Sequence, residues 1–199
     1  MSKYSIRTLL TAAVVTLPTL AMAHPGHGEI HGFSGGFAHP LGGLDHVLAM
    51  TLVGVLAAQL GGRALWLVPA SFVGVMALGG WTGFAGAGLP FVELGTAASI
   101  VVLGAIVAFG LSVPVAAVMG LVGFFAIFHG YAHGAEMPES AGGLTYAAGF
   151  MAATALLHTL GLVGGLLLDR ATKMRGTSIV RCLGGVGALA GVAILSGIL

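Results

Sequence analysis

The sequence predicts an all-α membrane protein, a bundle of about six transmembrane helices that follows a cleavable signal peptide. Apolar residues make up 57% of its 199 positions and charged residues only 7%, whereas about a quarter of the residues in a soluble domain are charged. Glycine occupies 35 positions, which suits membrane helices because small residues let their backbones approach closely. A surface with so little charge is expected to face lipid.

The first 23 residues have the three parts of a secretory signal peptide. Two basic residues precede an apolar run over residues 9–20, and the segment ends in Ala21-Met22-Ala23. This order of a basic start, a short apolar run and small residues is typical of a removed signal. We expect cleavage after Ala23, which leaves residues 24–40 as an external, histidine-bearing segment. An uncleaved signal anchor is the alternative.

Six apolar stretches follow, each long enough to cross a hydrocarbon core of about 30 Å. The connections between them are short, so residues 41–199 are predicted to form one transmembrane domain. The fifth stretch is longer than a span requires, and we expect it to tilt or to begin late. The stretches cover residues 41–60, 64–83, 91–111, 114–133, 143–168 and 179–198.

Three pairs of glycines with GxxxG spacing are candidate contact faces between these helices, because glycine permits close packing. The pairs are Gly130/Gly134, Gly161/Gly165 and Gly187/Gly191. The single cysteine, Cys182, excludes a disulfide framework within the chain and a thiolate metal cluster. The net charge of +1, without a basic patch, gives no reason to expect a nucleic-acid partner. The oligomeric state is left open.

The basic residues predict the orientation in a bacterial-type inner membrane. If the processed N-terminus is outside, the loops after the first, third and fifth spans are cytoplasmic. These loops and their borders contain all five basic residues of the mature chain, which agrees with the positive-inside rule. The residues are Arg63, Arg170, Lys173, Arg175 and Arg181.

Most of the eight histidines fall near the predicted outer end of the bundle. An ionisable group inside a membrane is costly, about 2.5–3.5 kcal/mol for Asp at a helix centre, and usually marks an ion or proton pathway. Glu93 also opens the third span from outside, whereas His158 lies deep in the fifth. The outer histidines are His24, His27, His31 and His39 in the external segment, His46 beside Asp45 in the first span, and His129 and His133, followed by Glu136, in the fourth.

The spacing of these residues favours metal binding. At 1.5 Å per residue, Asp45, His46 and His129 should lie at a similar depth, roughly 6–9 Å below the outer boundary. His129 and His133 are four residues apart and share one helix face, and Glu136 returns to that face if the helix continues to Pro138. Asp45 and His46 diverge by about 100°, so only one of them is expected to face the ion directly.

The position of His39 admits two interpretations. Seven residues of regular helix would hold it about 10 Å from His46, too far to share an ion. The two can ligate together if Gly42-Gly43 break the start of the helix, because glycine adopts conformations that other residues do not. Otherwise His39 and His46 are separate binding positions that the ion occupies one after the other.

Imidazole and carboxylate ligands suit nickel, cobalt, zinc or copper(II), and the lack of thiolates disfavours copper(I). Each residue also has a simpler interpretation. His129, His133, Asp45 and His46 could be satisfied by water or by interhelical hydrogen bonds. His158, with Thr154 one turn before it, could be packed and hydrogen-bonded. Glu93 and the histidines at 24, 27 and 31 could be solvated, or the latter could gather metal.

Two segments resemble the HupE/UreJ family of hydrogenase and urease accessory membrane proteins. Residues 39–46, HPLGGLDH, resemble the family's HPxxGxDH signature, and residues 128–136, FHGYAHGAE, resemble FHGxAHGxE. The likeness implies a nickel permease that supplies nickel enzymes, with cobalt as the cargo of some members and no bound cofactor. It also implies that the functional residues are His39, Asp45, His46, His129, His133 and Glu136.

The sequence therefore predicts a permease for a divalent metal ion and not an enzyme. No GxxxxGK[ST] phosphate loop is present, and facilitated uptake needs none. A cobalt permease of the same architecture is one alternative. Others are an intramembrane zinc-dependent hydrolase, for which no HExxH motif is present, a haem protein using His129 and His158, and a metal-binding accessory protein that does not transport.

Overall fold

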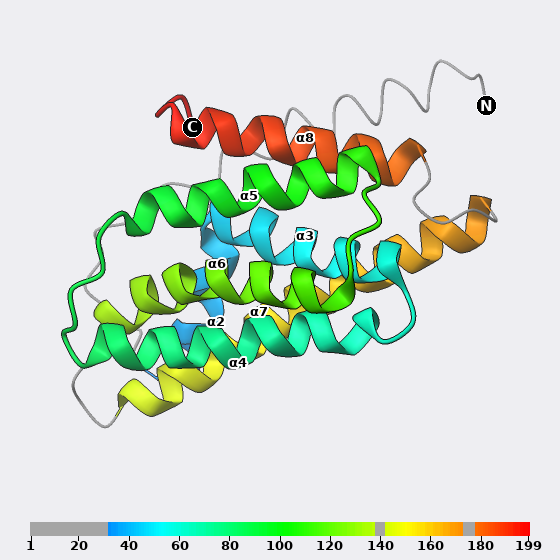
Figure 1. Cartoon of the computed structure of the whole chain (residues 1–199). Helices are drawn as coiled ribbons and strands as arrows, with labels where there is room; N and C mark the ends of the chain where they lie inside the picture. Colours follow the sequence, from blue (N-terminus) through cyan, green and yellow to red (C-terminus); the bar gives the residue numbers. More distant parts are fainter. Residues whose placement is uncertain (1–31, 138–141, 173–177) are drawn as a thin grey trace, which may run out of the picture.

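The computed structural model describes residues 32–137, 142–172 and 178–199. Within these residues the chain forms seven helices and no strand (Figure 1). The predicted signal peptide, His24, His27, His31, Lys173 and Arg175 lie outside the described residues. The helices are α2 (Phe33–Gly42), α3 (Leu44–Leu60), α4 (Ala64–Phe84), α5 (Val92–Phe109), α6 (Val115–Ala135), α7 (Gly142–Thr172) and α8 (Ser178–Leu195).

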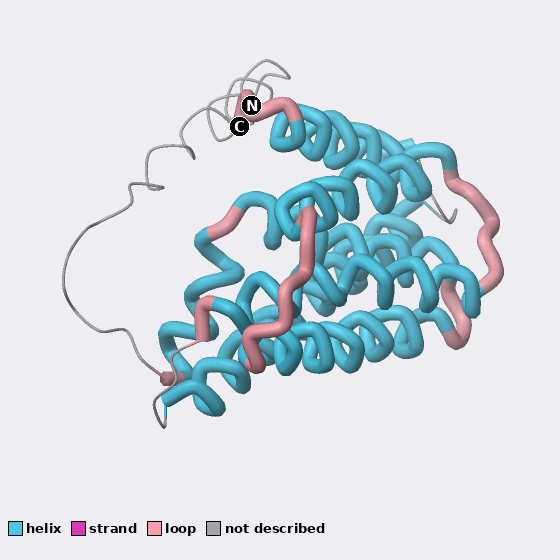
Figure 2. Tube along the Cα trace, turned by 60° about the vertical axis from the view of Figure 1, so that its left-hand side comes forward, coloured by secondary structure: helices cyan, strands magenta, loops and turns pink. Residues whose placement is uncertain are grey.

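The long helices run side by side, and the loops between them lie at the two ends of the bundle (Figure 2). Five helices, α4 to α8, are long and apolar enough to cross a membrane, and the bent pair α2 and α3 brings the number to six if it counts as one span. The predicted fold class, an all-α membrane bundle, is confirmed. Helix α3 lies at the centre and packs against α4, α5, α7 and α8.

The first span has the bent form of the two that the sequence left open. Helix α2 begins at Phe33, ends at Gly42, and meets α3 at an angle of 87°, so the straight helix from residue 41 is not formed. The chain turns at Gly43, which has extended backbone angles (φ −96°, ψ 119°). Pro40, which lacks an N–H, lies in the last turn of α2, so it weakens the helix immediately before the turn.

Helix α7 has 31 residues, which corresponds to about 46 Å. The sequence predicts that the fifth span tilts or begins late; the helix itself does not begin late, because it starts at Gly142, and the tilt stays a prediction. The extra length lets α7 contact both helices of the bent pair. The first turns of α7 pack against α2 and the following turns pack against α3.

Glycines allow neighbouring helices to pack closely, as predicted from the GxxxG spacings. A side chain at Gly130 or Gly134 would collide with the backbone carbonyl oxygens of Met76 and Gly80 on α4. A side chain at Gly161 would likewise meet the backbone of α3 at Thr51, and Gly187 and Gly191 of α8 lie against Leu52 and Val101. These contacts fix α6 on α4 and thereby position His129 and His133.

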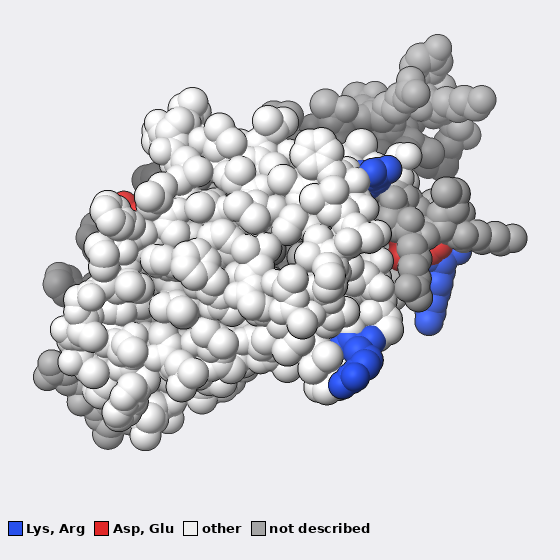
Figure 3. All heavy atoms as spheres, viewed as in Figure 1, with Lys and Arg blue, Asp and Glu red and all other residues white. Residues whose placement is uncertain are grey.

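The outer surface is apolar, as a lipid-facing surface must be. Trp66 and Trp81 of α4 are 58% and 69% exposed and stand 15 residues apart, about 22 Å along the helix. Tryptophan is enriched where membrane helices meet the lipid headgroups. The basic side chains of the described residues gather at one end of the bundle (Figure 3). They are Arg63 at the start of α4, Arg170 in the last turn of α7 and Arg181 in the first turn of α8.

Candidate metal centre

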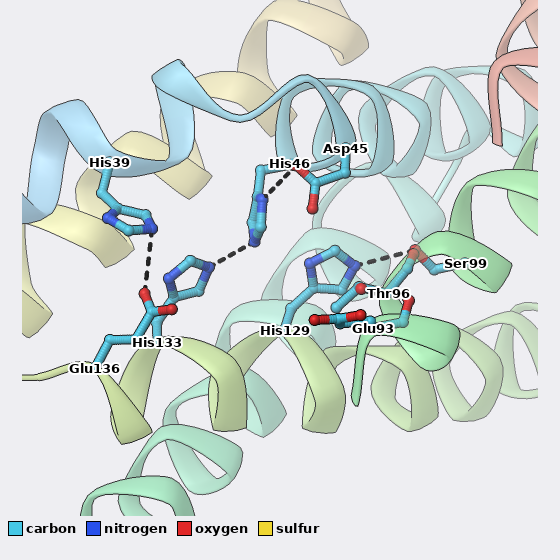
Figure 4. A network of polar contacts seen from close by, with 9 residues as sticks. All are labelled: His39, Asp45, His46, Glu93, Thr96, Ser99, His129, His133 and Glu136. Atoms are coloured by element: carbon cyan, nitrogen blue, oxygen red, sulfur yellow. Dashed lines mark hydrogen bonds and ion pairs between the residues drawn. The ribbon is translucent and has the colours of Figure 1, made fainter. Parts of the chain in front are cut away.

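The histidines of the two sequence motifs meet at one end of the bundle (Figure 4). His133 lies in the last turn of α6, whereas Arg181 lies beside Val115 at its start, so this end is opposite to the arginines. The bend at Gly43 turns α2 so that His39 and His46 both face α6. The His133 ring lies between them, with its centroid 4.7 Å from that of His39 and 4.5 Å from that of His46. His129 continues the row, 5.2 Å from His46 between ring centroids. Side chains from α2, α3 and α6 therefore form one continuous row of imidazoles.

The outer part of this row can hold a cation. One ligand atom each from His39, His133 and Glu136 lie within 4.8 Å of one another, and two nitrogens bound to one first-row dication at ~2.1 Å stand at most about 4.2 Å apart. Only a small closing movement is needed to bind an ion. The His39 and Glu136 side chains are 41% and 60% exposed, so this group is open to the outside of the bundle.

Glu136 reaches this group by a different route from the one predicted. Continuation of the helix to Pro138 is wrong, because α6 ends at Ala135 and Glu136 forms its C-cap (φ −93°, ψ −4°). The near-helical backbone still returns the carboxylate to the histidine face. Its Oε2 atom lies 3.5 Å from the Nε2 atom of His39, so a negative charge adjoins the imidazoles at the open side.

The next pair of imidazoles, His46 and His133, lies deeper. Asp45 orients the His46 ring. The Nδ1 atom of His46 is 2.9 Å from Oδ1 of Asp45, and an ionised carboxylate can only accept a hydrogen bond. His46 therefore donates through Nδ1 and presents the lone pair of Nε2 to the cluster. This arrangement is the one expected from the divergence of adjacent residues, with His46 facing inward and Asp45 orienting it.

His46 and His133 contact each other through their Nε2 atoms, which are 2.6 Å apart. Because His46 offers a lone pair there, His133 is the donor, and its own lone pair is then on Nδ1. That Nδ1 atom is buried and has no hydrogen-bond partner within the described residues. Two nitrogens bound cis to one ion at ~2.1 Å are about 3.0 Å apart, so an ion that binds both Nε2 atoms must displace the proton between them and separate the rings slightly.

His129 is oriented by a residue that the sequence analysis missed. The Ser99 hydroxyl on α5 donates to the Thr96 carbonyl at 2.5 Å and lies 3.0 Å from Nε2 of His129. Its one hydrogen is thus used, so it accepts from His129 Nε2–H. The fully buried His129 then carries its lone pair on Nδ1, which has no partner among the residues described. With these hydrogen bonds, each of the three inner imidazoles has one ring nitrogen that can be offered to an ion.

A sequence signal for Ser99 did exist. Glu93, Thr96 and Ser99 follow one another at intervals of three residues on an otherwise apolar helix, and such residues share a face. Glu93 is itself exposed in the first turn of α5, and its carbonyl accepts a hydrogen bond from the Thr96 hydroxyl at 2.9 Å. Its carboxylate belongs to none of the ligand groups that the described residues form.

His158 stays apart from the cluster. It is 2% exposed and packs edge-on against Phe72, with the two ring centroids 5.0 Å apart. The interpretation that it is hydrogen-bonded through Thr154 is not supported, because the Thr154 hydroxyl contacts the sulfur of Met76 at 3.8 Å. Neither nitrogen of His158 has a partner in the part of the chain that the structure describes.

Loss of the Ser99 hydroxyl should weaken metal binding without unfolding the protein. Residues that orient a metal-bound histidine typically contribute 10–100-fold to metal affinity, so we expect Ser99→Ala to raise the half-saturating nickel concentration about tenfold or more. Ser71→Ala is the matched control, because Ser71 makes the same kind of bond to Val68 O at 2.9 Å and lies outside the cluster. Equal nickel titrations of both purified variants would contradict the assigned orientation of His129.

The chain is similar to known proteins over almost its whole length. The family described as HupE / UreJ protein matches residues 12–194. Protein HupE of Rhizobium leguminosarum bv. viciae is 45% identical over 196 residues, which cover 98% of this chain and 100% of that protein. No solved structure matches the chain.

Proposed function

The chain belongs to the HupE/UreJ family, and we propose from this premise that it is an inner-membrane permease that carries a divalent transition-metal ion, nickel first of all, into the cell. The observation that carries the proposal is the row of imidazoles from α2, α3 and α6, which begins at the exposed His39 and ends at the fully buried His129. A site for a structural ion would not need such a graded series.

The ligand chemistry supports a borderline dication. The row offers imidazole nitrogens with Asp45 and Glu136 beside them, and the carboxylates offset the charge of an ion in a medium of low dielectric. The only cysteine of the chain, Cys182, lies on α8 and is exposed, so no thiolate joins the site. Nickel, cobalt and zinc all accept these ligands. Nickel is preferred because of the family resemblance.

The direction of transport follows from the proposed orientation. If the arginine end faces the cytoplasm, the histidine row opens to the periplasm and leads inward. An inside-negative membrane potential then favours entry by about 2.3 kcal/mol per charge per 100 mV, or about 4.6 kcal/mol for a dication. An imidazole must have a deprotonated nitrogen to bind the ion. Nδ1 of His129 and Nδ1 of His133 have no partner among the described residues, and Nε2 of His46 can exchange its contact with His133 for the ion.

Nickel accumulation in cells tests the proposal through two residues on different helices. We expect Asp45→Ala and His129→Ala each to lower nickel uptake by about tenfold or more at wild-type expression, because one orients a ligand and the other supplies one. Cobalt and zinc added as competitors identify the preferred cargo. Normal nickel uptake by both variants would show that this cluster is not the transport site.

The alternatives predict different results in the same cells. An accessory protein that binds without transport would leave cellular nickel unchanged when it is expressed or deleted. An intramembrane zinc hydrolase would retain one zinc per chain after purification and show no metal flux.

A further inference from the structure

Beyond the histidine row, the described part of the bundle contains a buried imidazole that makes no hydrogen bond to the described residues. His158 lies in the middle of α7 and is 2% exposed, and neither of its ring nitrogens has a partner among the described residues. A buried polar group in this state destabilises a fold. Packing alone therefore gives no reason for a histidine at this position, where leucine or phenylalanine would fill similar space.

Phe72 connects this histidine to the row. Its ring is fully buried, and its centroid lies 5.6 Å from that of His129 and 5.0 Å from that of His158. Gly130, the neighbour of His129, packs against Met76, and Phe72 is one turn farther inward on α4, or about 6 Å. An ion that leaves His129 toward the cell interior therefore meets the Phe72 ring first.

The surroundings of His158 offer further donors. Phe72 and Met76 are one turn apart on α4, and Thr154 and His158 are one turn apart on α7. The two pairs face each other, since Phe72 contacts His158 and the Thr154 hydroxyl lies 3.8 Å from the sulfur of Met76. A thioether sulfur and a hydroxyl oxygen thus meet about one helical turn from the His158 imidazole. Nitrogen and sulfur ligands suit borderline dications and not magnesium or calcium.

We propose that His158 is an inner station for the transported dication, with Met76 and Thr154 as neighbouring donors, and that the Phe72 ring is the barrier between this station and the outer histidine row. The inference rests on the proposed transport function and adds to it a second binding position and a gate. Rotation of one aromatic ring then decides whether the ion can move from His129 to His158. Because the station lacks a carboxylate among its described neighbours, it holds the ion less firmly than the outer row, which favours release inward.

His158→Leu separates this role from a structural one. We expect its unfolding temperature in detergent to equal or exceed that of the wild type, because an unpartnered polar group is removed. The affinity of the outer row for nickel should stay within twofold of the wild type. Nickel influx into proteoliposomes should fall about tenfold or more, which corresponds to an activation free energy about 1.4 kcal/mol higher at the slow step. Thr159→Val, an adjacent substitution at an exposed position, serves as the control and should transport normally.

Phe72→Leu and Phe72→Ala test the barrier in the same vesicles. A smaller side chain should raise the rate of nickel influx and let magnesium compete, and Phe72→Leu keeps most of the packing if the alanine variant folds poorly. Wild-type influx in His158→Leu, or a lower unfolding temperature, would overturn the inner station and leave the proposed function standing. Vesicles in which the wild type itself moves no nickel would overturn both.

Discussion

Nickel uptake should fall about a hundredfold when His133 is replaced by alanine. His133 is the residue that links the outer group to the deeper pair, because it lies with His39 and Glu136 in one ligand group and contacts His46 through Nε2 at 2.6 Å. Removal of a residue that merely orients a ligand costs ~10–100-fold in metal affinity, so removal of the ligand itself should reach at least the upper end. The measurement is the initial rate of nickel uptake by cells at equal amounts of membrane-inserted protein.

Two comparisons make this result specific. Tyr131→Phe alters the same helix two residues away and should leave uptake unchanged. His39→Ala removes an exposed member of the row and should reduce uptake less than His133→Ala does, because the deeper pair of His46 and His133 survives. An uptake loss in His133→Ala no larger than that in His39→Ala would show that His133 is not the link between the two parts of the row.

Gly130→Ala should separate α6 from α4 and abolish both stability and transport. The new methyl group would collide with the carbonyl oxygen of Met76 and lie 2.8 Å from the backbone nitrogen of Gly80. Backbone atoms cannot rotate away as a side chain can, so the helices must move apart, at a cost of about 1–3 kcal/mol in the free energy of unfolding. The shift also carries His129 and His133 away from His46. Thermal unfolding in detergent and nickel uptake should both decline.

Gly120→Ala is the matched control on the same helix. A methyl group there meets no atom within 4 Å, and exchange of glycine for alanine within a helix is favourable by roughly 0.5–1 kcal/mol. We therefore expect opposite signs, with a lower unfolding temperature for Gly130→Ala and an equal or higher one for Gly120→Ala. Similar unfolding temperatures for the two variants would contradict the close contact of α6 with α4.

The sequence predicts those parts of the fold that depend on single helices. Length and apolarity place α4, α5, α6 and α8 within a few residues, and the four-residue spacing of His129 and His133 places both on the inner face of α6, where they are buried. The spacing of His39 and His46 admitted a bent or a straight start, and the structure shows the bent one. That choice depends on the packing of α2 against α7, which no local pattern contains.

Contacts between helices explain what sequence reasoning missed. Ser99 resembles a small packing residue until α5 is seen to hold it 3.0 Å from His129. Similarly, Thr154 suggests a partner for His158 because the two share a helix face, yet its hydroxyl faces Met76 on another helix. The identity of a buried polar group's partner depends on which helices adjoin, whereas its presence on an inner face can be predicted from periodicity alone.

Nickel influx into proteoliposomes that contain only the purified protein shows whether the chain itself transports the ion. With an inside-negative potential imposed across the vesicle membrane, we predict saturable nickel influx that increases with the potential and is blocked by cobalt. Vesicles with His133→Ala should take up no more nickel than vesicles without protein. Wild-type vesicles that accumulate nickel no faster than protein-free ones would contradict the account, because then the imidazoles of α2, α3 and α6 would bind a metal ion without passing it on.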